Sequence, residues 1–296
     1  MSAMASSRFD VLIQRSVKAF RSKRLALPPN SSVGFVPTMG ALHEGHLSLV
    51  KEAKAKNDIV ISSIFVNPTQ FGPNEDLDRY PQQLQEDASM LEDLGVDLIF
   101  APDRDEMYLE NHTTFVTPEV FEMTAEGKAR PGFFTGVATV VTKLFNVVQP
   151  TNAYFGQKDA VQCCVIKRIV KDLNIPTNVV IMPTVRESDG LAMSSRNAYL
   201  TVEERSVAPV VFKSLLAGEQ VWLDGGRVAN KEQIVAEVER VLKEEPMMTE
   251  IEYVSVDSNI NMLPIDSVDA DGCCLSLAVK CGEVRLIDNI VFGVAR

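Results

Sequence analysis

Two histidines lie three residues apart in the run Pro37-Thr-Met-Gly-Ala-Leu-His-Glu-Gly-His46, and the whole chain contains only three histidines. Residues at positions i and i+3 share one face at the start of a helix, so both imidazoles are expected on the same side. Gly40 and Gly45 let a phosphate approach the backbone, and a helix N-terminus offers N–H groups and a positive dipole end. The run therefore predicts a nucleotide-phosphate site in which His43 and His46 donate to phosphate oxygens.

Three other interpretations of this run compete with the nucleotide site. The spacing of Gly40 and Gly45 resembles a Walker P-loop, but His46-Leu47 stands where that motif requires Lys-[Ser/Thr], which excludes it. A zinc pair needs further ligands, and the third histidine, His112, is remote in sequence. Two incidental surface histidines stay open as an alternative.

A second polar run, Phe155-Gly-Gln-Lys-Asp-Ala-Val-Gln162, stands at a predicted junction between a strand and a helix. Lys158 places a point charge beside a helix N-terminus that already attracts anions. Asp159 and Gln162 have the spacing of a capping box, and helix capping explains these two residues as well as ligand binding does. The run therefore adds Lys158 as a candidate phosphate contact.

Two loop segments could also bind ligands. The segment Arg186-Glu-Ser-Asp-Gly-Leu-Ala-Met-Ser-Ser-Arg-Asn197 combines hydroxyls and a guanidinium, which suit polyphosphate, although a solvated loop would have a similar composition. The segment 67–81 is polar, rich in proline and directly follows a predicted strand. Ligands of open α/β sheets bind beyond the carboxyl ends of strands, so we predict a binding loop there.

Apolar runs and helical stripes alternate through the first part of the chain. Strands alternating with helices indicate a parallel sheet covered on both faces. We therefore predict an α/β fold in which residues 1–185 form a Rossmann-like, doubly wound parallel sheet that binds nucleotide. The expected strands are 33–36, 59–66, 97–100, 153–155 and 179–182, and the expected helices are 44–56, 82–94, 137–148 and 159–173.

The pattern changes after Arg186. Helices are predicted at 201–216, opened by a capping box of Thr201 and Glu204, and at 229–242. Strands are predicted at 251–256, 274–279 and 283–287. We interpret residues 186–296 as a smaller α+β lid domain.

Composition narrows the class of protein. Lys+Arg 29 against Asp+Glu 40 gives a net charge of −11, which disfavours binding to nucleic acid or to anionic membranes. No stretch approaches the roughly 18–20 apolar residues of a membrane helix, and the N-terminus lacks the layout of a secretory signal. Five cysteines without a C-x-x-C motif argue against a zinc site or a disulfide framework. We expect a cytoplasmic enzyme.

Four runs follow one another in order along the chain: P-T-M-G-A-L-H-E-G-H, F-V-N-P-T-Q-F-G, F-G-Q-K-D and M-S-S-R-N. Together they resemble the pantothenate synthetase (pantoate–β-alanine ligase) family, and they are similar to the HIGH and KMSKS elements of the nucleotidyltransferase superfamily. The resemblance is strong over Pro37–Tyr199 and continues weakly to Arg285-Leu-Ile-Asp-Asn289. It implies that pantoate attacks the α-phosphate of ATP to form pantoyl adenylate and pyrophosphate. The amine of β-alanine then attacks the acyl carbon, and AMP leaves.

The resemblance also implies the roles of individual residues. His46 is the proton donor, His43 assists at the phosphates and Lys158 neutralises the α-phosphate. Gln70 holds pantoate and borders the β-alanine site, where we also place Asn67, and Gln162 binds pantoate from the other side. The implied ATP site comprises Met39, Gly40, Ala41, Leu42, His43, Glu44, Gly45, His46, Gly156, Gln157, Lys158, Asp159, Val185, Met193, Ser194, Ser195 and Arg196.

Magnesium is expected to bridge the phosphates of ATP and to keep most of its waters. Asp87 is our candidate protein ligand, although a solvated helix face explains it equally well. The family also implies a homodimer. One motif departs from the family: Phe133 and Thr135 stand where a histidine and an arginine are common in G-H-F-R-G, which removes two residues that could serve an anionic substrate.

Two rival functions remain. Cytidylyl- and adenylyltransferases share the HIGH-like motif but keep the nucleotidyl group in the product, and Gln70 and Gln162 argue against them. A catalytically silent nucleotide-binding or scaffolding protein would keep the fold without the chemistry. The candidate phosphate contacts are retained together, which argues against that alternative; they are His43, His46, Lys158, Ser194, Ser195 and Arg196.

Overall fold

The computed structural model describes residues 12–73 and 75–293, which divide into two compact units. Unit 1 covers the residues up to Pro118, Gly132–Gly156 and Val165–Met182. Unit 2 covers Glu119–Pro131, Gln157–Cys164 and the residues from Pro183 onward. The chain passes from unit 1 to unit 2 for the last time between Met182 and Pro183, close to the domain boundary predicted at 185. Two earlier segments of the predicted first domain, 119–131 and 157–164, also belong to unit 2.

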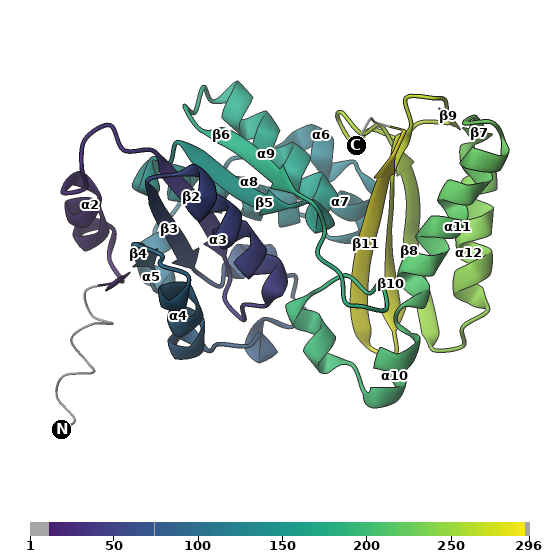
Figure 1. The fold of residues 1–296 in the computed structure, drawn as a ribbon, viewed down its shortest axis with the longest axis horizontal. Coiled ribbons are helices and arrows are strands. Elements are labelled where there is room, and N and C mark those ends of the chain that lie inside the picture. The colour runs from purple at the N-terminus through teal and green to yellow at the C-terminus, as the bar shows by residue number, and fades with distance from the viewer. Residues whose placement is uncertain (1–11, 74, 294–296) are drawn as a thin grey trace. The chain divides into compact units, whose positions relative to one another are not determined.

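Unit 1 contains a six-stranded sheet whose paired strands are all parallel (Figure 1). The predicted α/β fold with a doubly wound parallel sheet is confirmed. The strand order reverses between β2 and β5, which are neighbours in the sheet although more than a hundred residues separate them in the chain. The order is β1 (Ile13–Gln14), β4 (Leu98–Phe100), β3 (Ile59–Ile64), β2 (Val33–Thr38), β5 (Asn152–Gly156) and β6 (Asn178–Met182).

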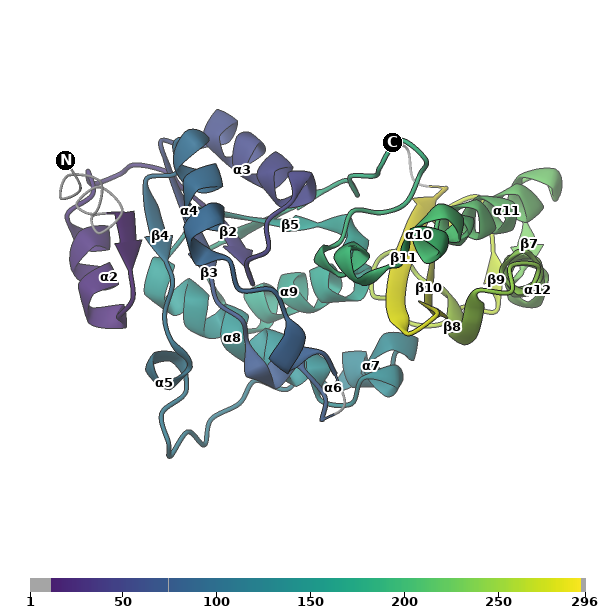
Figure 2. The ribbon, with the colours of Figure 1, turned by 90° about the horizontal axis from the view of Figure 1, so that it is seen from below.

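Helices cover both faces of this sheet (Figure 2). Val36 of β2 packs in the cluster that contains Val50 and Leu91 from the helices of one face. Its neighbour Phe35 points to the other face and contacts Phe145 edge-on. This alternation is the period-2 pattern of a strand buried on both sides. The helices are α3 (Glu44–Lys56) and α4 (Leu84–Asp93) on one face, and α8 (Phe133–Val148) and α9 (Ala160–Asp172) on the other.

Unit 2 is built on a three-stranded antiparallel sheet with two helices packed on one face (Figure 1). Leu215 and Trp222 of one helix and Val238 of the other join Leu275 and Leu277 of the central strand in one buried cluster. The smaller α+β domain is therefore present. The strands are β8 (Met248–Asp257), β10 (Cys273–Cys281) and β11 (Val284–Phe292), and the helices are α11 (Val210–Asp224) and α12 (Lys231–Lys243).

The helix predicted over 201–216 is wrong in one respect, because the structure divides it into α10 (Val202–Val207) and α11. Pro209 is the N-cap of α11, and a proline has no N–H with which to continue the preceding helix. The predicted capping box of Thr201 and Glu204 is confirmed at the start of α10.

The remaining elements are short and had no clear periodicity in the sequence. The segment 67–81 contains two 3-10 turns, η1 (Pro68–Gln70) and η2 (Leu77–Arg79). Among the described helices, none combines the length and the apolar character needed to span a membrane. All five cysteines are free thiols. The other elements are α2 (Val17–Leu25), α5 (Arg104–Met107), α6 (Glu119–Glu122), α7 (Ala125–Ala129), β7 (Ala229–Asn230) and β9 (Ser267–Val268).

Candidate functional site

In unit 1, the turn after β2 leads into the first turn of α3, and we call residues 39–46, which include both histidines, the histidine turn. Gly40 and Ala41 both adopt left-handed backbone angles, with φ of +84° and +51°. A Cβ at Gly40 would lie 2.9 Å from a carboxylate oxygen of Asp87, so only glycine fits there. The helix α3 then begins at Glu44 with His43 as its N-cap.

The two imidazoles form a capping box at the start of α3. Nδ1 of His43 accepts from the N–H of Gly45 at 3.2 Å, and Nδ1 of His46 accepts from the N–H of His43 at 3.4 Å. The ring centroids are 4.1 Å apart. Because both Nδ1 atoms accept, each neutral ring carries its proton on Nε2. The capping geometry therefore sets both rings up as Nε2–H donors.

Asp87 of α4 stabilises the backbone of the histidine turn. It is fully buried, and its carboxylate accepts from the N–H groups of Ala41 and Leu42, each at 2.9 Å. Its third donor is Nε2 of Gln83 at 3.3 Å. A carboxylate with this burial and these partners supports the loop, and the prediction that Asp87 is a metal ligand stays a prediction. Among residues 12–73 and 75–293, no three or more His, Cys, Asp or Glu side chains gather in a cluster that could hold a metal ion.

Asn67 and Gln70 lie in the η1 turn, against the first turns of α8. The Asn67 side chain is 1% exposed and donates to Oε1 of Gln70 at 2.9 Å and to the carbonyl of Gly136 at 3.3 Å. A Cβ at Gly136 would lie 2.3 Å from the carbonyl of Thr69, so this glycine permits the close approach. The geometry makes Asn67 a support for Gln70 rather than an exposed contact.

The parallel neighbours β2 and β5 end at the same edge of the unit 1 sheet. The histidine turn follows β2, and Gly156 is the last residue of β5. Ligands of open α/β sheets bind outside the carboxyl ends of the strands where the strand order reverses. This edge between β2 and β5 is that reversal point, so the fold places the histidine turn and Gly156 where a nucleotide is expected.

In unit 2, the run Gln157–Asp159 forms the 3-10 turn η3, which leads into α9, and we call it the lysine turn. The Lys158 side chain is 19% exposed, and its Nζ lies 3.8 Å from Oδ2 of Asp159. Gln162 follows in the first turn of α9 and is half-buried. The sequence predicted a helix that begins at Asp159, whereas α9 begins at Ala160 and Asp159 is the last residue of η3.

The loop from Val185 to Arg196 folds back on itself. Met193 donates its N–H to the carbonyl of Val185 at 3.0 Å, which brings together two residues predicted to contact ATP. Ser194 caps the turn η4 (Ser195–Tyr199) by accepting from the N–H of Arg196 at 3.3 Å. The segment is therefore an ordered loop closed by its own hydrogen bonds.

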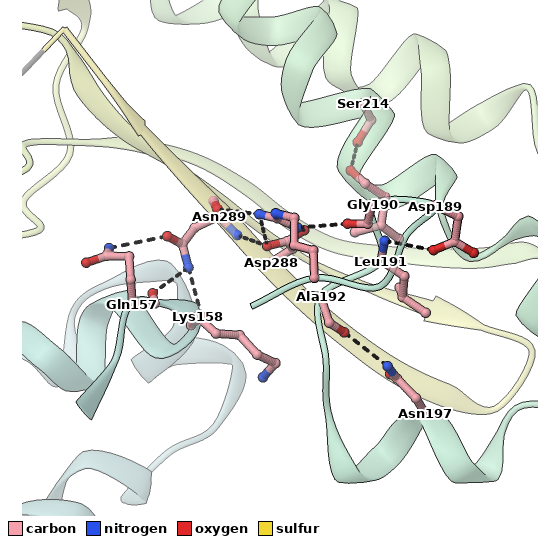
Figure 3. Close-up of polar contacts among 12 residues, drawn as sticks. Gln157, Lys158, Asp189, Gly190, Leu191, Ala192, Asn197, Ser214, Asp288 and Asn289 are labelled. Carbon is pink, nitrogen blue, oxygen red and sulfur yellow. Dashed lines mark hydrogen bonds and ion pairs between the residues drawn. The ribbon is translucent and has the colours of Figure 1, made fainter. Parts of the chain in front are cut away.

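Sequence reasoning missed two polar residues that organise unit 2, Asp288 and Asn289 of β11 (Figure 3). Asn289 bonds the backbone of the lysine turn, and Asp288 pairs with Arg186 at 2.6 Å. The signal was present, because the resemblance extended weakly to Arg285-Leu-Ile-Asp-Asn289, but nothing in the sequence assigned these residues a role.

Residues 12–291 match the family model described as pantoate-beta-alanine ligase. Among similar proteins, the pantothenate synthetase of Chloroflexus aurantiacus is 50% identical over 94% of this chain and 96% of that protein. The pantothenate synthetase of Herpetosiphon aurantiacus is 51% identical over 88% and 94%.

Solved structures agree with this assignment. The pantothenate synthetase of Thermus thermophilus superposes with a TM-score of 0.87 at 44% identity, covering 94% of this chain and 98% of that one. The pantoate-beta-alanine ligase of Francisella tularensis, solved with β-γ ATP and β-alanine, gives a TM-score of 0.78 at 38% identity, covering 95% and 97%. The chain therefore belongs to the pantoate–β-alanine ligase family and is an ATP-dependent ligase that forms a C–N bond between pantoate and β-alanine.

Proposed function

We propose that the chain performs this ligation in two steps through pantoyl adenylate. The pantoate carboxylate attacks the α-phosphorus of ATP and pyrophosphate leaves, and the β-alanine amine then attacks the acyl carbon, with AMP as the second leaving group. The observation that carries the proposal is the pair of Nδ1-accepting imidazoles at the start of α3. Transfer of the adenylyl group from ATP to a carboxylate needs donors aimed at the charge that develops on phosphate oxygens.

Within this scheme, His46 is the proton donor and His43 assists at the phosphates. Both rings carry the Nε2–H that such donation requires. Residues 39–42, which we also predict to contact ATP, form the turn that orients the two histidines. Lys158 neutralises the α-phosphate, and Gly156–Asp159, Val185 and Met193–Arg196 complete the proposed nucleotide contacts. Support comes from their backbones, since each lies in a turn closed by hydrogen bonds.

Gln70 and Gln162 are proposed to bind pantoate, with Gln70 also bordering the β-alanine site. A primary amide suits a hydroxy acid because it both donates and accepts. The bond from Asn67 to Oε1 of Gln70 orients the Gln70 amide, so we assign Asn67 to positioning Gln70 within the acid site.

Magnesium is proposed to bind through the phosphates of ATP. When bound there, it would offset the charge of the phosphates as carboxylate and triphosphate approach. Asp87 stays in its loop-supporting role in this proposal, because its carboxylate already accepts three N–H groups.

The test is ATP–pyrophosphate exchange with pantoate present and β-alanine withheld. Pantoate-dependent exchange is expected, since the first step is reversible and needs no amine. Two results would exclude a separate adenylation step that forms pantoyl adenylate before β-alanine reacts. One is exchange that requires β-alanine, and the other is pantothenate formation without any exchange.

We also propose a cytoplasmic homodimer. Five free thiols suit a reducing compartment. Each unit also exposes large apolar side chains, Leu109 and Phe115 in unit 1 and Val120 and Met123 in unit 2, each more than half exposed. Exposed apolar side chains of this size favour contact with a second copy of the chain. Light scattering after gel filtration should give twice the 32.6 kDa mass of the chain.

A further inference from the structure

Asp288 and Asn289 are adjacent buried polar residues in β11, with exposed fractions of 3% and 4%. Successive residues of a strand point to opposite faces, so two such neighbours reach different loops. Asn289 reaches the lysine turn, as Figure 3 shows, and Asp288 pairs with Arg186. Buried polar groups in a strand cost free energy unless they are bonded, and both of these are.

The Asn289 amide uses its donors and its acceptor on the lysine turn. Nδ2 donates to the carbonyl of Gln157 at 3.0 Å and to the carbonyl of Lys158 at 2.8 Å. Oδ1 accepts from Nε2 of Gln157 at 3.3 Å. Two adjacent carbonyls held by one amide fix the peptide from which the Lys158 side chain departs. An aspartate of the same shape would set a carboxylate against those carbonyls.

Asp288 fixes the second loop through Arg186. The guanidinium donates to both carboxylate oxygens, at 2.6 and 3.0 Å, and also to the carbonyls of Gly190 and Asn289 at 3.1 and 3.3 Å. It stacks on the ring of Phe212 with its central carbon 3.7 Å from the ring centroid. The guanidinium of Arg186 is fixed by hydrogen bonds along its edge and by the Phe212 ring on its face. This fixes the start of the loop that continues to Met193.

We propose that Asn289 is a positioning residue for Lys158, and that it and its neighbour Asp288 let one strand set the geometry of both nucleotide loops of unit 2. This inference rests on the proposed role of Lys158 at the α-phosphate. Asn289 itself contacts no substrate in this proposal, and it acts only through the backbone of the lysine turn.

The first test replaces Asn289 with Asp in the full chain and measures pantoate-dependent ATP–pyrophosphate exchange. The rate is expected to fall roughly 10- to 100-fold, because small displacements of a positioned group have costs of that size. Asn259→Asp is the matched control, since Asn259 also donates to a carbonyl, that of Asp271, in a turn of the same unit. The control should keep its exchange rate. Asn289→Ser repeats the test without a new charge if Asn289→Asp does not fold.

The decisive measurement combines each Asn289 variant with Lys158→Ala. A residue that acts through Lys158 should lower the rate by less than about threefold once that lysine is absent, because coupled residues are not additive. An equal fold-loss with and without Lys158 would show that Asn289 merely stabilises the fold, and would overturn the inference while leaving the role of Lys158 intact. Full exchange activity in Lys158→Ala alone would remove the role of Lys158 and the inference together.

Discussion

The two compact units hold their polar turns with opposite hydrogen-bonding chemistry. In unit 1, the carboxylate of Asp87 accepts the N–H groups of Ala41 and Leu42. In unit 2, the amide of Asn289 donates to the carbonyls of Gln157 and Lys158. Each support comes from a neighbouring regular element rather than from the turn itself. A buried side chain on a helix or strand thus fixes the backbone that carries a proposed catalytic group.

The difference follows from the backbone of each turn. Left-handed angles at Gly40 and Ala41 turn successive N–H groups toward one point, and such a concavity needs an anionic acceptor. The 3-10 turn after β5 presents carbonyls instead, and these need a donor. An amide also adds no negative charge beside Lys158, whereas a carboxylate there would compete with phosphate for the ammonium. The chemistry of the support is therefore fitted to the group that the turn carries.

The group carried by the histidine turn should give the largest effect. His46→Ala removes the Nε2–H donor, and we expect adenylation measured by pyrophosphate exchange to fall by about 10²–10⁴-fold. His112→Ala is the control, because His112 lies outside both turns and packs against the rings of Tyr108 and Phe115. Unchanged exchange in His46→Ala would remove its role as the proton donor.

The group carried by the lysine turn should give the next largest effect. Lys158→Ala withdraws positive charge from the α-phosphate, and adenylation should fall by about 10²-fold, as when one donor to a developing charge is deleted. Lys171→Ala is matched, since Lys171 is an exposed lysine near the C-terminal end of α9. If both variants exchange equally well, Lys158 has no part in the first step.

Asp87→Asn tests the support in unit 1, as Asn289→Asp does in unit 2. An amide group would set two donors against the N–H of Ala41 or Leu42, and an unsatisfied buried group costs about 1–3 kcal/mol of unfolding free energy. We expect that loss together with a roughly tenfold slower adenylation, read from urea unfolding and exchange. Asp93→Asn, in the last turn of the same helix and exposed, should change neither. Retained stability would mean that the histidine turn holds itself.

The sequence predicted the elements with strong periodicity and the turns with distinctive residues. The helix 44–56 has the predicted bounds, and the histidine turn, whose glycines and histidines predicted a phosphate site, follows β2 at the strand-order reversal. The support that Asp87 gives to the histidine turn could not be predicted, because a carboxylate in the first turn of a helix looks solvated until the turn that it faces is known. Asn289 was hidden for the same reason, since a strand of alternating residues does not show which loop crosses it.

Asp257 in β8 is a second buried carboxylate, and it differs from Asp87 in its hydrogen-bond partners. It is buried like Asp87, at 2% exposed, but it accepts from the hydroxyl of Ser255 at 2.8 Å, a weaker compensation than three N–H groups. Burial raises the pKa of Asp257 to about 6, against the lowering by Ser255 and by the charge of Lys231. Between about pH 4 and pH 6 the folded chain therefore holds a proton on Asp257 that the unfolded chain has released. The contribution of Asp257 to the free energy of unfolding consequently falls as the pH rises through this range.

Asp257→Asn cannot ionise and should escape that loss. Its unfolding free energy relative to the unsubstituted chain should increase from pH 4.5 to pH 7.5, by on the order of 1–3 kcal/mol for a shift of about two pKa units. Exposed Asp266→Asn changes the net charge equally and should show no such trend. A constant difference across the pH range would mean that burial does not raise the pKa of Asp257, and that the single hydroxyl of Ser255 compensates its carboxylate.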